Sequence, residues 1–458
     1  MSSISEVDLP PIVDAESTRQ VRKSASSRTI PNGSRGENWL IVTQYYPPEP
    51  GAPQIRLHTL ARNLLKQGIH VTVLTGMPNY PTGVVQEGYR GKLSYREEID
   101  GIDVRRVWLF AATGRNPVKR LCNYLSFTFA ATFYALFCMR RFDMLFIESQ
   151  PMTLGFLGVL MKWFRRVPYV YNIPDLQTDV AKELGFLGGR VLLWIAVLME
   201  NFFMRQSLTV STVTQRFIDY YVKRGIRREQ ISFLPNGADT DILFPLPYDA
   251  VYASKMNVSG KTVFTYAGTH AYYHGLEVLI EAARILKSRD DIVLLLVGEG
   301  PVRQKLKDMV LEYGLTNVVF GQSPFDEMPQ LMSITCASLV VMKDIPAADK
   351  MRLSKTFPPL ACGVPVIYSG RGESAEMVVE QHCGLGVAPE APAELAAAIE
   401  RLADDPKLRN ELGQNGVEFI RRELSWSSII SNWLVQLHNT SCPKNFRNGE
   451  MPRRQNEI

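Results

Sequence analysis

The chain has 458 residues, 46% of them hydrophobic, and carries 51 basic and 46 acidic residues for a formal net charge of +5. This length exceeds what one hydrophobic core usually supports, so we expect two domains. The near balance of charge gives no reason to expect a nucleic-acid partner. Six cysteines without a CxxC pair predict reduced thiols and a cytoplasmic protein.

The two ends of the chain are polar and lack a sustained apolar period. Residues 1–37 are rich in Ser, Thr and charged residues and contain no apolar stretch of the secretory type. Residues 442–458 have the same character. We therefore expect disordered tails at both ends.

The first predicted domain, residues 38–235, begins with a strand over 40–43, a loop containing Gly51, and a helix that ends at Gly68. Further apolar, β-branched runs alternate with helical stretches, a pattern typical of a mostly parallel sheet. These further predicted strands are 71–74, 104–107, 144–147, 169–173 and 208–211.

One nearly uncharged apolar run, residues 121–139, approaches the length that spans a bilayer. A transmembrane helix is therefore one interpretation. The polar residues Asn123, Ser126 and Thr128, and the position of the run between two strands of one sheet, favour a helix packed on that sheet.

Two more apolar stretches, 152–164 and 191–204, lie in the same domain with basic residues around them. Aromatic and basic residues mixed in this way are typical of an interfacial surface. We expect peripheral contact with the cytoplasmic face of the inner membrane.

A linker rich in Pro, Gly and Asp, residues 236–250, precedes the second predicted domain, residues 251–425. We expect a last helix over 426–441 that returns to the first domain. The predicted strands of the second domain are 263–267, 292–297, 318–320, 339–342 and 365–368, and its predicted helices are 276–286, 302–313, 328–332 and 392–403.

Ligands of doubly wound sheets lie beyond the carboxyl ends of the strands, where helix N-termini favour phosphate. The candidate loops are 47–56, 269–275, 298–301 and 369–374. Glycine in such loops lets the backbone approach a ligand, although each single glycine is also ordinary turn chemistry.

The order and spacing of several segments resemble the family-4 retaining glycosyltransferases of GT-B fold, in the branch that assembles bacterial exopolysaccharide or lipopolysaccharide. The resemblance spans roughly residues 39–425. A NAD-type enzyme is disfavoured, because no GxGxxG follows the first strand. The segments are YYPPEPGAPQIR, PNGADTDILFP, YAGTHAYYHGLEVLIEAA, LLLVGEGPVRQKLK, NVVFGQ and ACGVPVI.

The resemblance implies an α/β protein of two Rossmann-like, doubly wound domains facing a central cleft. It implies transfer of a sugar from a nucleotide diphosphate sugar, held mainly by the second domain, to a glycan or lipid-linked acceptor. Configuration would be retained, and no metal or other cofactor would be needed, because basic side chains and helix N-termini neutralise the leaving diphosphate.

The resemblance also implies site residues. Asp175 would orient an acceptor hydroxyl or be an ordinary loop cap, and Arg56 would pair with the diphosphate or be a solvated helix residue. Glu373 and Glu376 would contact donor sugar and phosphate or cap the following helix. The implied donor site as a whole is Gly51, Arg56, Gly268, Thr269, Gly298, Ser354, Glu373 and Glu376.

The chain departs from the family at two places. His274 stands where the family commonly has Lys, so its charge would depend on pH. Lys350 and Pro358 occupy the positions of the family's pair of glutamates. Lys355, beside Ser354, is then a candidate phosphate clamp, although a surface ion pair is an alternative. With Asp175, His274 and Lys355 are the candidate catalytic residues.

The missing glutamate pair leaves a second function open, a catalytically silent relative that binds nucleotide sugar or glycan as a partner subunit. The DTD of residues 239–241 also matches the metal–diphosphate motif of the other glycosyltransferase fold, although so short a motif matches easily by chance. In the resembled family this segment is an interdomain turn at Asn236 and Gly237, with Phe244 packed. We expect no metal site.

Overall fold

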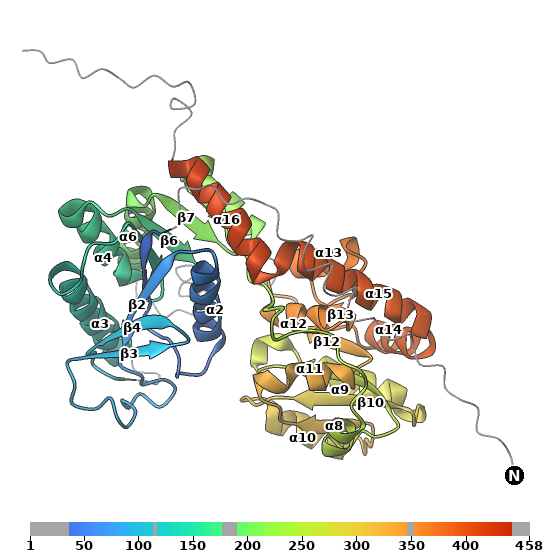
Figure 1. The fold of residues 1–458 in the computed structure, drawn as a ribbon. Coiled ribbons are helices and arrows are strands. Elements are labelled where there is room, and N and C mark those ends of the chain that lie inside the picture. Colours follow the sequence, from blue (N-terminus) through green and yellow to red (C-terminus); the bar gives the residue numbers. More distant parts are fainter. Residues whose placement is uncertain (1–35, 113–116, 176–189, 346–351, 442–458) are drawn as a thin grey trace, which may run out of the picture.

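The computed structural model describes residues 36–112, 117–175, 190–345 and 352–441, folded into two α/β domains (Figure 1). The expected tails, 1–37 and 442–458, lie almost wholly outside the described residues. The first domain contains an eight-stranded sheet of order β3-β4-β2-β1-β5-β6-β7-β8, parallel except between β3 and β4. Its strands are β1 (Asn38–Val42), β2 (His70–Gly76), β3 (Ser94–Ile99), β4 (Ile102–Val107), β5 (Met144–Glu148), β6 (Tyr169–Ile173), β7 (Thr209–Thr212) and β8 (Ile231–Phe233).

Alternate residues of these strands face two different cores, as the period of two along a strand requires. Trp39 and Ile41 pack with α2, whereas Leu40 and Val42 pack with α3, α4 and α6 on the opposite face. The helical segments of this domain are α2 (Ala52–Lys66), α3 (Pro117–Phe137), η1 (Met152–Leu154), α4 (Gly155–Leu160), η2 (Met161–Arg165), α6 (Arg190–Gln206), α7 (Gln215–Lys223) and η3 (Arg228–Gln230).

The second domain contains a six-stranded, fully parallel sheet of order β11-β10-β9-β12-β13-β14, the doubly wound order of dinucleotide-type folds. Both sheets confirm the predicted α/β class of two Rossmann-like domains. The strands are β9 (Thr262–Ala267), β10 (Ile292–Val297), β11 (Val318–Gly321), β12 (Ala337–Val341), β13 (Val366–Ser369) and β14 (Gly384–Val387).

Helices cover both faces of this second sheet (Figure 1). They are α8 (Ala250–Lys255), η4 (Tyr272–His274), α9 (Glu277–Ile285), η5 (Leu286–Ser288), α10 (Arg303–Glu312), η6 (Phe325–Glu327), α11 (Met328–Ser333), η8 (Ser354–Thr356), α12 (Phe357–Ala361), α13 (Glu373–Glu380), α14 (Pro392–Asp404), α15 (Pro406–Phe419) and η9 (Ile420–Leu424).

The chain crosses between the domains twice, and the two crossings are hydrogen-bonded to each other. Ala238 N donates to Leu424 O at 2.9 Å, and Trp426 N donates to Ala238 O at 3.2 Å. After the second crossing, α16 (Trp426–Ser441) packs on α2 and β8 of the first domain. Figure 1 shows this helix lying across the first domain.

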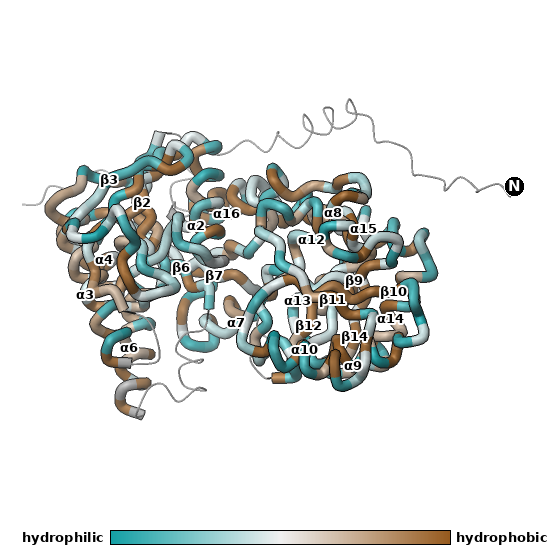
Figure 2. The backbone as a smooth tube through the Cα atoms, turned by 90° about the horizontal axis from the view of Figure 1, so that it is seen from below, coloured by the Kyte–Doolittle hydropathy of each residue, from teal (hydrophilic) through white to brown (hydrophobic). Residues whose placement is uncertain are grey.

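One detail differs from expectation. Phe244 is 43% exposed, and its neighbour Leu243 is the residue buried at the linker. The run 121–139 lies for most of its length in α3, whose inner side packs on the sheet through Phe127 and Ala131, as expected. None of the described helices is long and apolar enough to cross a membrane. Figure 2 nevertheless shows strongly apolar stretches in α3, α4 and α6.

Candidate active site

A cavity of about 760 Å³ lies between the domains, at the carboxyl ends of strands from both sheets. Gly51 follows β1, Asp175 follows β6, and Gly268 and Gly298 follow β9 and β10. This is where doubly wound sheets bind ligands, because helix N-termini and strand ends converge there. Of the predicted site residues, those that line the cavity are Gly51, Arg56, Asp175, Gly268, Thr269, His274, Gly298, Ser354 and Lys355.

The glycine loops of the second domain lie in contact with each other. A β-carbon on Gly298, whose φ is 136°, would lie 2.1 Å from Gly268 O. Only glycine therefore allows the loops after β9 and β10 to meet at this edge of the cavity.

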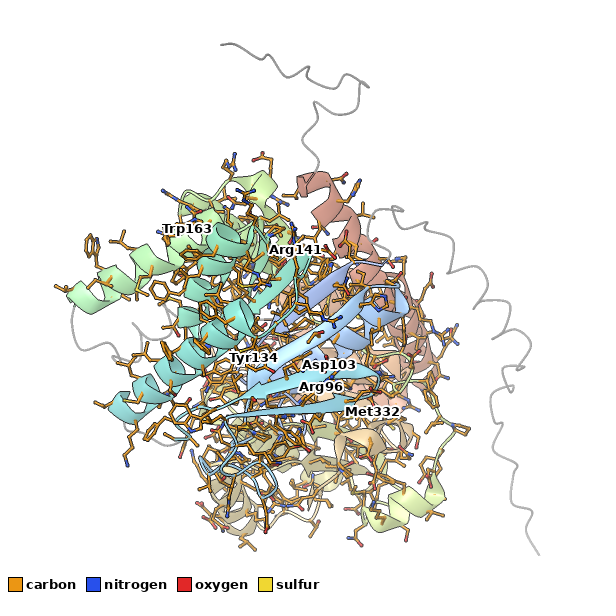
Figure 3. All side chains as sticks on the ribbon, turned by 60° about the vertical axis from the view of Figure 1, so that its left-hand side comes forward. Arg96, Asp103, Tyr134, Arg141, Trp163 and Met332 are labelled. Carbon is orange, nitrogen blue, oxygen red and sulfur yellow. The ribbon has the colours of Figure 1, made fainter. Side chains whose placement is uncertain are left out.

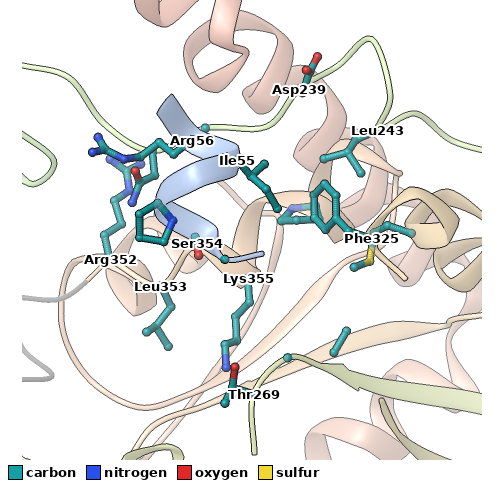
Figure 4. Close-up of a pocket in the computed structure, with 18 of the residues that line it drawn as sticks. Ile55, Arg56, Asp239, Leu243, Thr269, Phe325, Arg352, Leu353, Ser354 and Lys355 are labelled. Carbon is teal, nitrogen blue, oxygen red and sulfur yellow. The ribbon is translucent and has the colours of Figure 1, made fainter. Parts of the chain in front are cut away.

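Lys355 lies at the centre of the second-domain side, held by two neutral groups. Its Nζ donates to Tyr266 Oη at 2.7 Å and lies 3.0 Å from His274 Nε2. Desolvation lowers the pKa of Lys355 to about 7. In Figure 4 the side chain extends toward Thr269.

His274 is 4% exposed, and burial together with Lys355 lowers its pKa to about 3. The imidazole is therefore neutral at neutral pH, unlike the lysine common in the family. When Lys355 is protonated, its ammonium donates to Nε2, and the proton of the neutral ring is then on Nδ1. This nitrogen is buried and has no hydrogen-bond partner among the described residues.

Pro358 and Pro359 do not interrupt a helix, because they occupy the first turn of α12, where a missing N–H costs nothing. The segment before α12 brings Ser354 and Leu353 to the cavity wall (Figure 4). Arg352 lines the same wall with a side chain that is 7% exposed, and burial lowers its pKa.

Arg56, on α2, reaches the cavity from the first domain but is already paired. Its Nη2 lies 2.7 Å from both carboxylate oxygens of Glu148. Asn172 Nδ2 donates to the same carboxylate at 2.8 Å. Burial raises the pKa of Glu148, although Arg56 opposes the shift. The guanidinium therefore reaches the cavity with most of its charge compensated.

Asp175 lies at the first-domain edge of the cavity, where its Oδ2 accepts from Gln150 Nε2 at 3.0 Å. Both residues follow strand ends, β6 and β5, so they present polar atoms side by side. An acceptor hydroxyl in the cavity could hydrogen-bond to this pair.

Glu373 and Glu376, in the first turn of α13, do not line the cavity. They contact the first domain instead. Glu373 Oε2 accepts from Gln215 N at 3.0 Å, at the N-terminus of α7, and Glu376 Oε1 accepts from Arg216 Nη2 at 2.6 Å. Their position in the first turn of α13 also fits the alternative that they stabilise the N-terminus of their own helix.

The acids of the DTD segment are paired with basic residues of α2. Asp239 lies 3.8 Å from Arg62, and Asp241 forms an ion pair with Lys66. Within the described ranges, no group of three His, Cys, Asp or Glu residues is arranged to hold a metal ion.

Three participants in the site were not predicted from the sequence: Tyr266, Arg352 and Glu148. Tyr266 lies inside the predicted strand 263–267, where an aromatic residue is ordinary and gives no sign of a role in the site. Arg352 stands three residues before Lys355 in the segment RLSK, and a second basic residue so close to the clamp was a usable signal. Nothing in the local sequence connects Glu148 to Arg56, because they are 92 residues apart.

The chain belongs to the family-4 glycosyltransferases of GT-B fold. Residues 51–237 match the family model described as "Glycosyl transferase 4-like domain", and residues 253–419 match "Glycosyl transferases group 1". Together these matches confirm the resemblance and the prediction of an enzyme that transfers glycosyl groups. They give no support to the silent alternative.

Two relatives match this chain over most of its length and most of their own. The putative colanic acid biosynthesis glycosyl transferase WcaI of Escherichia coli K12 is 26% identical over 81% of this chain and 92% of its own. The MMP alpha-(1->4)-mannosyltransferase of Mycolicibacterium hassiacum is 24% identical over 83% of this chain and 93% of its own.

Solved structures share the fold. Sucrose-phosphate synthase of Thermosynechococcus elongatus superposes with a TM-score of 0.66 at 21% identity, covering 88% of this chain and 98% of its own. HepE of Anabaena, in complex with UDP and glucose, gives a TM-score of 0.65 at 17% identity, covering 88% of this chain and 100% of its own.

Proposed function

We propose that the protein moves a sugar from a nucleotide diphosphate sugar, bound mainly by the second domain, to a glycan or lipid-linked sugar bound mainly by the first. The observation that carries this proposal is the Lys355 ammonium, which faces the cavity between the neutral groups of Tyr266 and His274. Among the described residues it forms no ion pair. A cation withdrawn from water is stabilised by an anion, and a diphosphate supplies one.

In this reaction the bond between the anomeric carbon and the donor phosphate oxygen breaks, and negative charge develops on the leaving diphosphate. Lys355, held in place by Tyr266 and His274, would stabilise that charge, so no metal is required. The acceptor oxygen would bond to the anomeric carbon on the same face and give its proton to the leaving phosphate oxygen. Configuration is then retained.

Asp175, with Gln150, would orient the acceptor hydroxyl from the opposite wall. WcaI is named for colanic acid biosynthesis, which supports a surface polysaccharide as the product class. This product class supports a location in the cytoplasm, in peripheral contact with the inner membrane.

The first test is a thermal-shift panel of the purified chain against UDP, GDP, dTDP and their sugar conjugates. HepE was solved with UDP, so UDP-glucose is the first donor to examine. A specific ligand raises the melting temperature by mass action, by an amount that grows with its concentration over Kd. The absence of any shift at millimolar nucleotide would contradict the proposal.

Substitution separates the enzyme from the silent relative. Lys355→Met, alone and with His274→Ala, should reduce release of nucleotide diphosphate by about a hundredfold or more, the loss typical when one donor to a developing anion is removed. Cellular polysaccharide formation that survives both changes would favour the silent relative.

A further inference from the structure

Helix α3 carries two apolar stripes on opposite sides. Phe127, Ala131 and Ala135 are buried against the sheet. The second stripe is offset from the first by two residues, which is about 200° around a helix, so it points away from the domain. It consists of the exposed side chains Leu121, Leu125, Phe129, Phe133 and Phe137.

The neighbouring segments extend this outer stripe. Helix α4 packs against both α3 and α6. Rings from these segments meet across them: Phe156 with Phe203 at 4.9 Å, and Trp163 with Phe202 at 6.3 Å between centroids. We call the combined surface the apolar face, defined by the outer stripe of α3 with Phe156, Trp163, Phe164, Val191, Trp194, Ile195, Leu198 and Phe202, all of them exposed.

The charge around the apolar face is predominantly positive. Over residues 117–143, 152–166 and 190–206 the sequence contains two acids. Glu200 is 3% exposed and bonded to Arg224 at 2.7 Å, and Asp143 accepts from Asn38 N at 2.8 Å. Exposed basic residues flank both ends of α3 and the ends of η2 and α6. They are Lys119, Arg120, Arg140, Arg141, Lys162, Arg166 and Arg205.

The views agree on where this surface lies. Figure 1 places α3, α4 and α6 on the side of the first domain that faces away from the second. Figure 3 turns that side forward and shows Trp163 and Arg141 on it.

The apolar face is also connected to the acceptor side of the cavity. Gln150, which lines the cavity, precedes η1 by two residues, and Thr153 of η1 bonds Thr128 of α3 at 2.7 Å between hydroxyl oxygens. The position of the apolar face therefore fixes the position of that cavity wall.

We propose that the apolar face docks flat on an anionic lipid bilayer, with its aromatic side chains at the level of the headgroups and its basic residues on lipid phosphates. The exposed apolar stripe of α3 is about 24 Å long, at 1.5 Å per residue. Contiguous exposed apolar surface of this extent is typical of an interaction site. Aromatic rings rimmed mainly by cations are complementary to the interface of anionic lipid. The inference rests on the proposed function only in that the acceptor would be lipid-linked.

The test is flotation of the full-length protein with vesicles of phosphatidylcholine alone or with one-third phosphatidylglycerol. Wild type should bind the anionic vesicles at least tenfold more strongly. Phe129→Ser/Phe133→Ser should lower that binding at least tenfold, and Arg140→Gln/Arg141→Gln should remove the preference for anionic lipid. The matched control, Val251→Ser/Leu311→Ser, changes side chains 82% and 78% exposed on the second domain and should bind as wild type does.

Melting temperature and nucleotide-sugar binding without vesicles are measured for every variant. Variants that keep both but lose vesicle binding support the docking surface. Failure of wild type to float, or equal loss in the Val251/Leu311 control, overturns it. A wild-type dimer that Phe129→Ser/Phe133→Ser dissociates, without vesicle binding, would assign the apolar face to a second copy instead. Vesicle binding without any nucleotide-sugar binding would leave docking intact and refute the proposed transfer.

Discussion

The hydrogen bond between Lys355 and His274 decides which of the two residues carries charge. Both groups are withdrawn from water, and two cations 3.0 Å apart would repel strongly. Protonation of His274 is suppressed, with its pKa near 3, while the ammonium of Lys355 titrates near 7. Anion binding in this cavity therefore depends on a lysine that loses its proton close to neutral pH.

A pH-dependent affinity for donor follows. Above pH 7 free Lys355 is neutral, so binding a diphosphate must be accompanied by proton uptake, and affinity should fall by up to about tenfold per pH unit between pH 7 and 9. Isothermal titration with UDP-glucose, whose phosphates do not titrate in this range, measures the slope. Lys355→Arg keeps its charge throughout and should give a flat profile. A wild-type profile equally flat would contradict the prediction.

The same desolvation affects stability, with a definite sign. The pKa of Lys355 is lower in the folded chain than the usual value near 10.4 of an unfolded one, so the unfolded state binds more protons between pH 7 and about 10. The contribution of this residue to stability therefore increases as pH rises through that window. Activity and stability should respond to pH in opposite directions.

Single residues were predictable from sequence where the backbone or local spacing defines them. The loop residues Gly268 and Gly298, and Lys355, were placed in one site from sequence alone, and all three line the cavity. The partners of Arg56 and Glu373 were not predictable. Each is engaged by a residue from another strand or domain, and nothing nearby in sequence indicates such contacts.

Among the elements, α7 of the first domain and α13 of the second are in direct contact and connect the two domains. The amide of Gln215 at the N-terminus of α7 donates to Glu373, a placement that favours a carboxylate. Beside it, Arg216 pairs with Glu376, and these side chains are 28% and 54% exposed. Such an exposed pair contributes little to the free energy of unfolding. It nevertheless joins the two domains directly.

We expect Arg216→Ala to change the free energy of unfolding by less than about 0.5 kcal/mol, because exposed ion pairs contribute little. It should nevertheless populate more open arrangements and raise the radius of gyration in X-ray scattering at low salt. Arg422→Ala is the matched control, since Arg422 pairs with Glu423 at 2.9 Å within a single domain. Identical scattering from wild type and both variants would show that the contact does not hold the domains.

The elements that sequence predicted well are the buried parallel strands and the helices between them. The strands that it did not predict are β3, β8 and β14. The sequence of β3, SYREEI, has three consecutive charged residues at the sheet edge, and β14, GLGV, is short and glycine-rich, so neither carries the apolar signal of a central strand. These segments are strands because each pairs with the edge of a sheet, and only the folded sheet defines where that edge lies.

At the scale of the whole molecule, α16 links the end of the chain to the core of the first domain. Trp433 is fully buried, its Nε1 donates to Ser211 at 3.0 Å and Ser232 at 3.1 Å, and its ring meets Trp39 at 5.9 Å between centroids. The first domain is therefore completed by residues that follow the second.

Trp433→Ala should lower the free energy of unfolding by about 3–5 kcal/mol, the range for removing a buried aromatic side chain. Val435→Ala, at a position 43% exposed on the same helix, should cost less than about 1 kcal/mol. Urea unfolding followed by circular dichroism compares them. Equal midpoints for the two variants would mean that α16 does not contribute to the core.

The paired crossings at Ala238 and Leu424–Trp426 restrict how the two domains can move. Two domains joined by a single chain segment can twist, bend and slide relative to each other. When a second chain segment runs beside the first and is hydrogen-bonded to it, twisting the domains would break those hydrogen bonds. Bending both segments together leaves the hydrogen bonds intact. We therefore expect the domains to retain rotation about one axis at this double crossing, which would move the second domain toward the acceptor wall without turning it sideways. In each such closing movement of the two domains, Lys355 would approach the same part of the first domain.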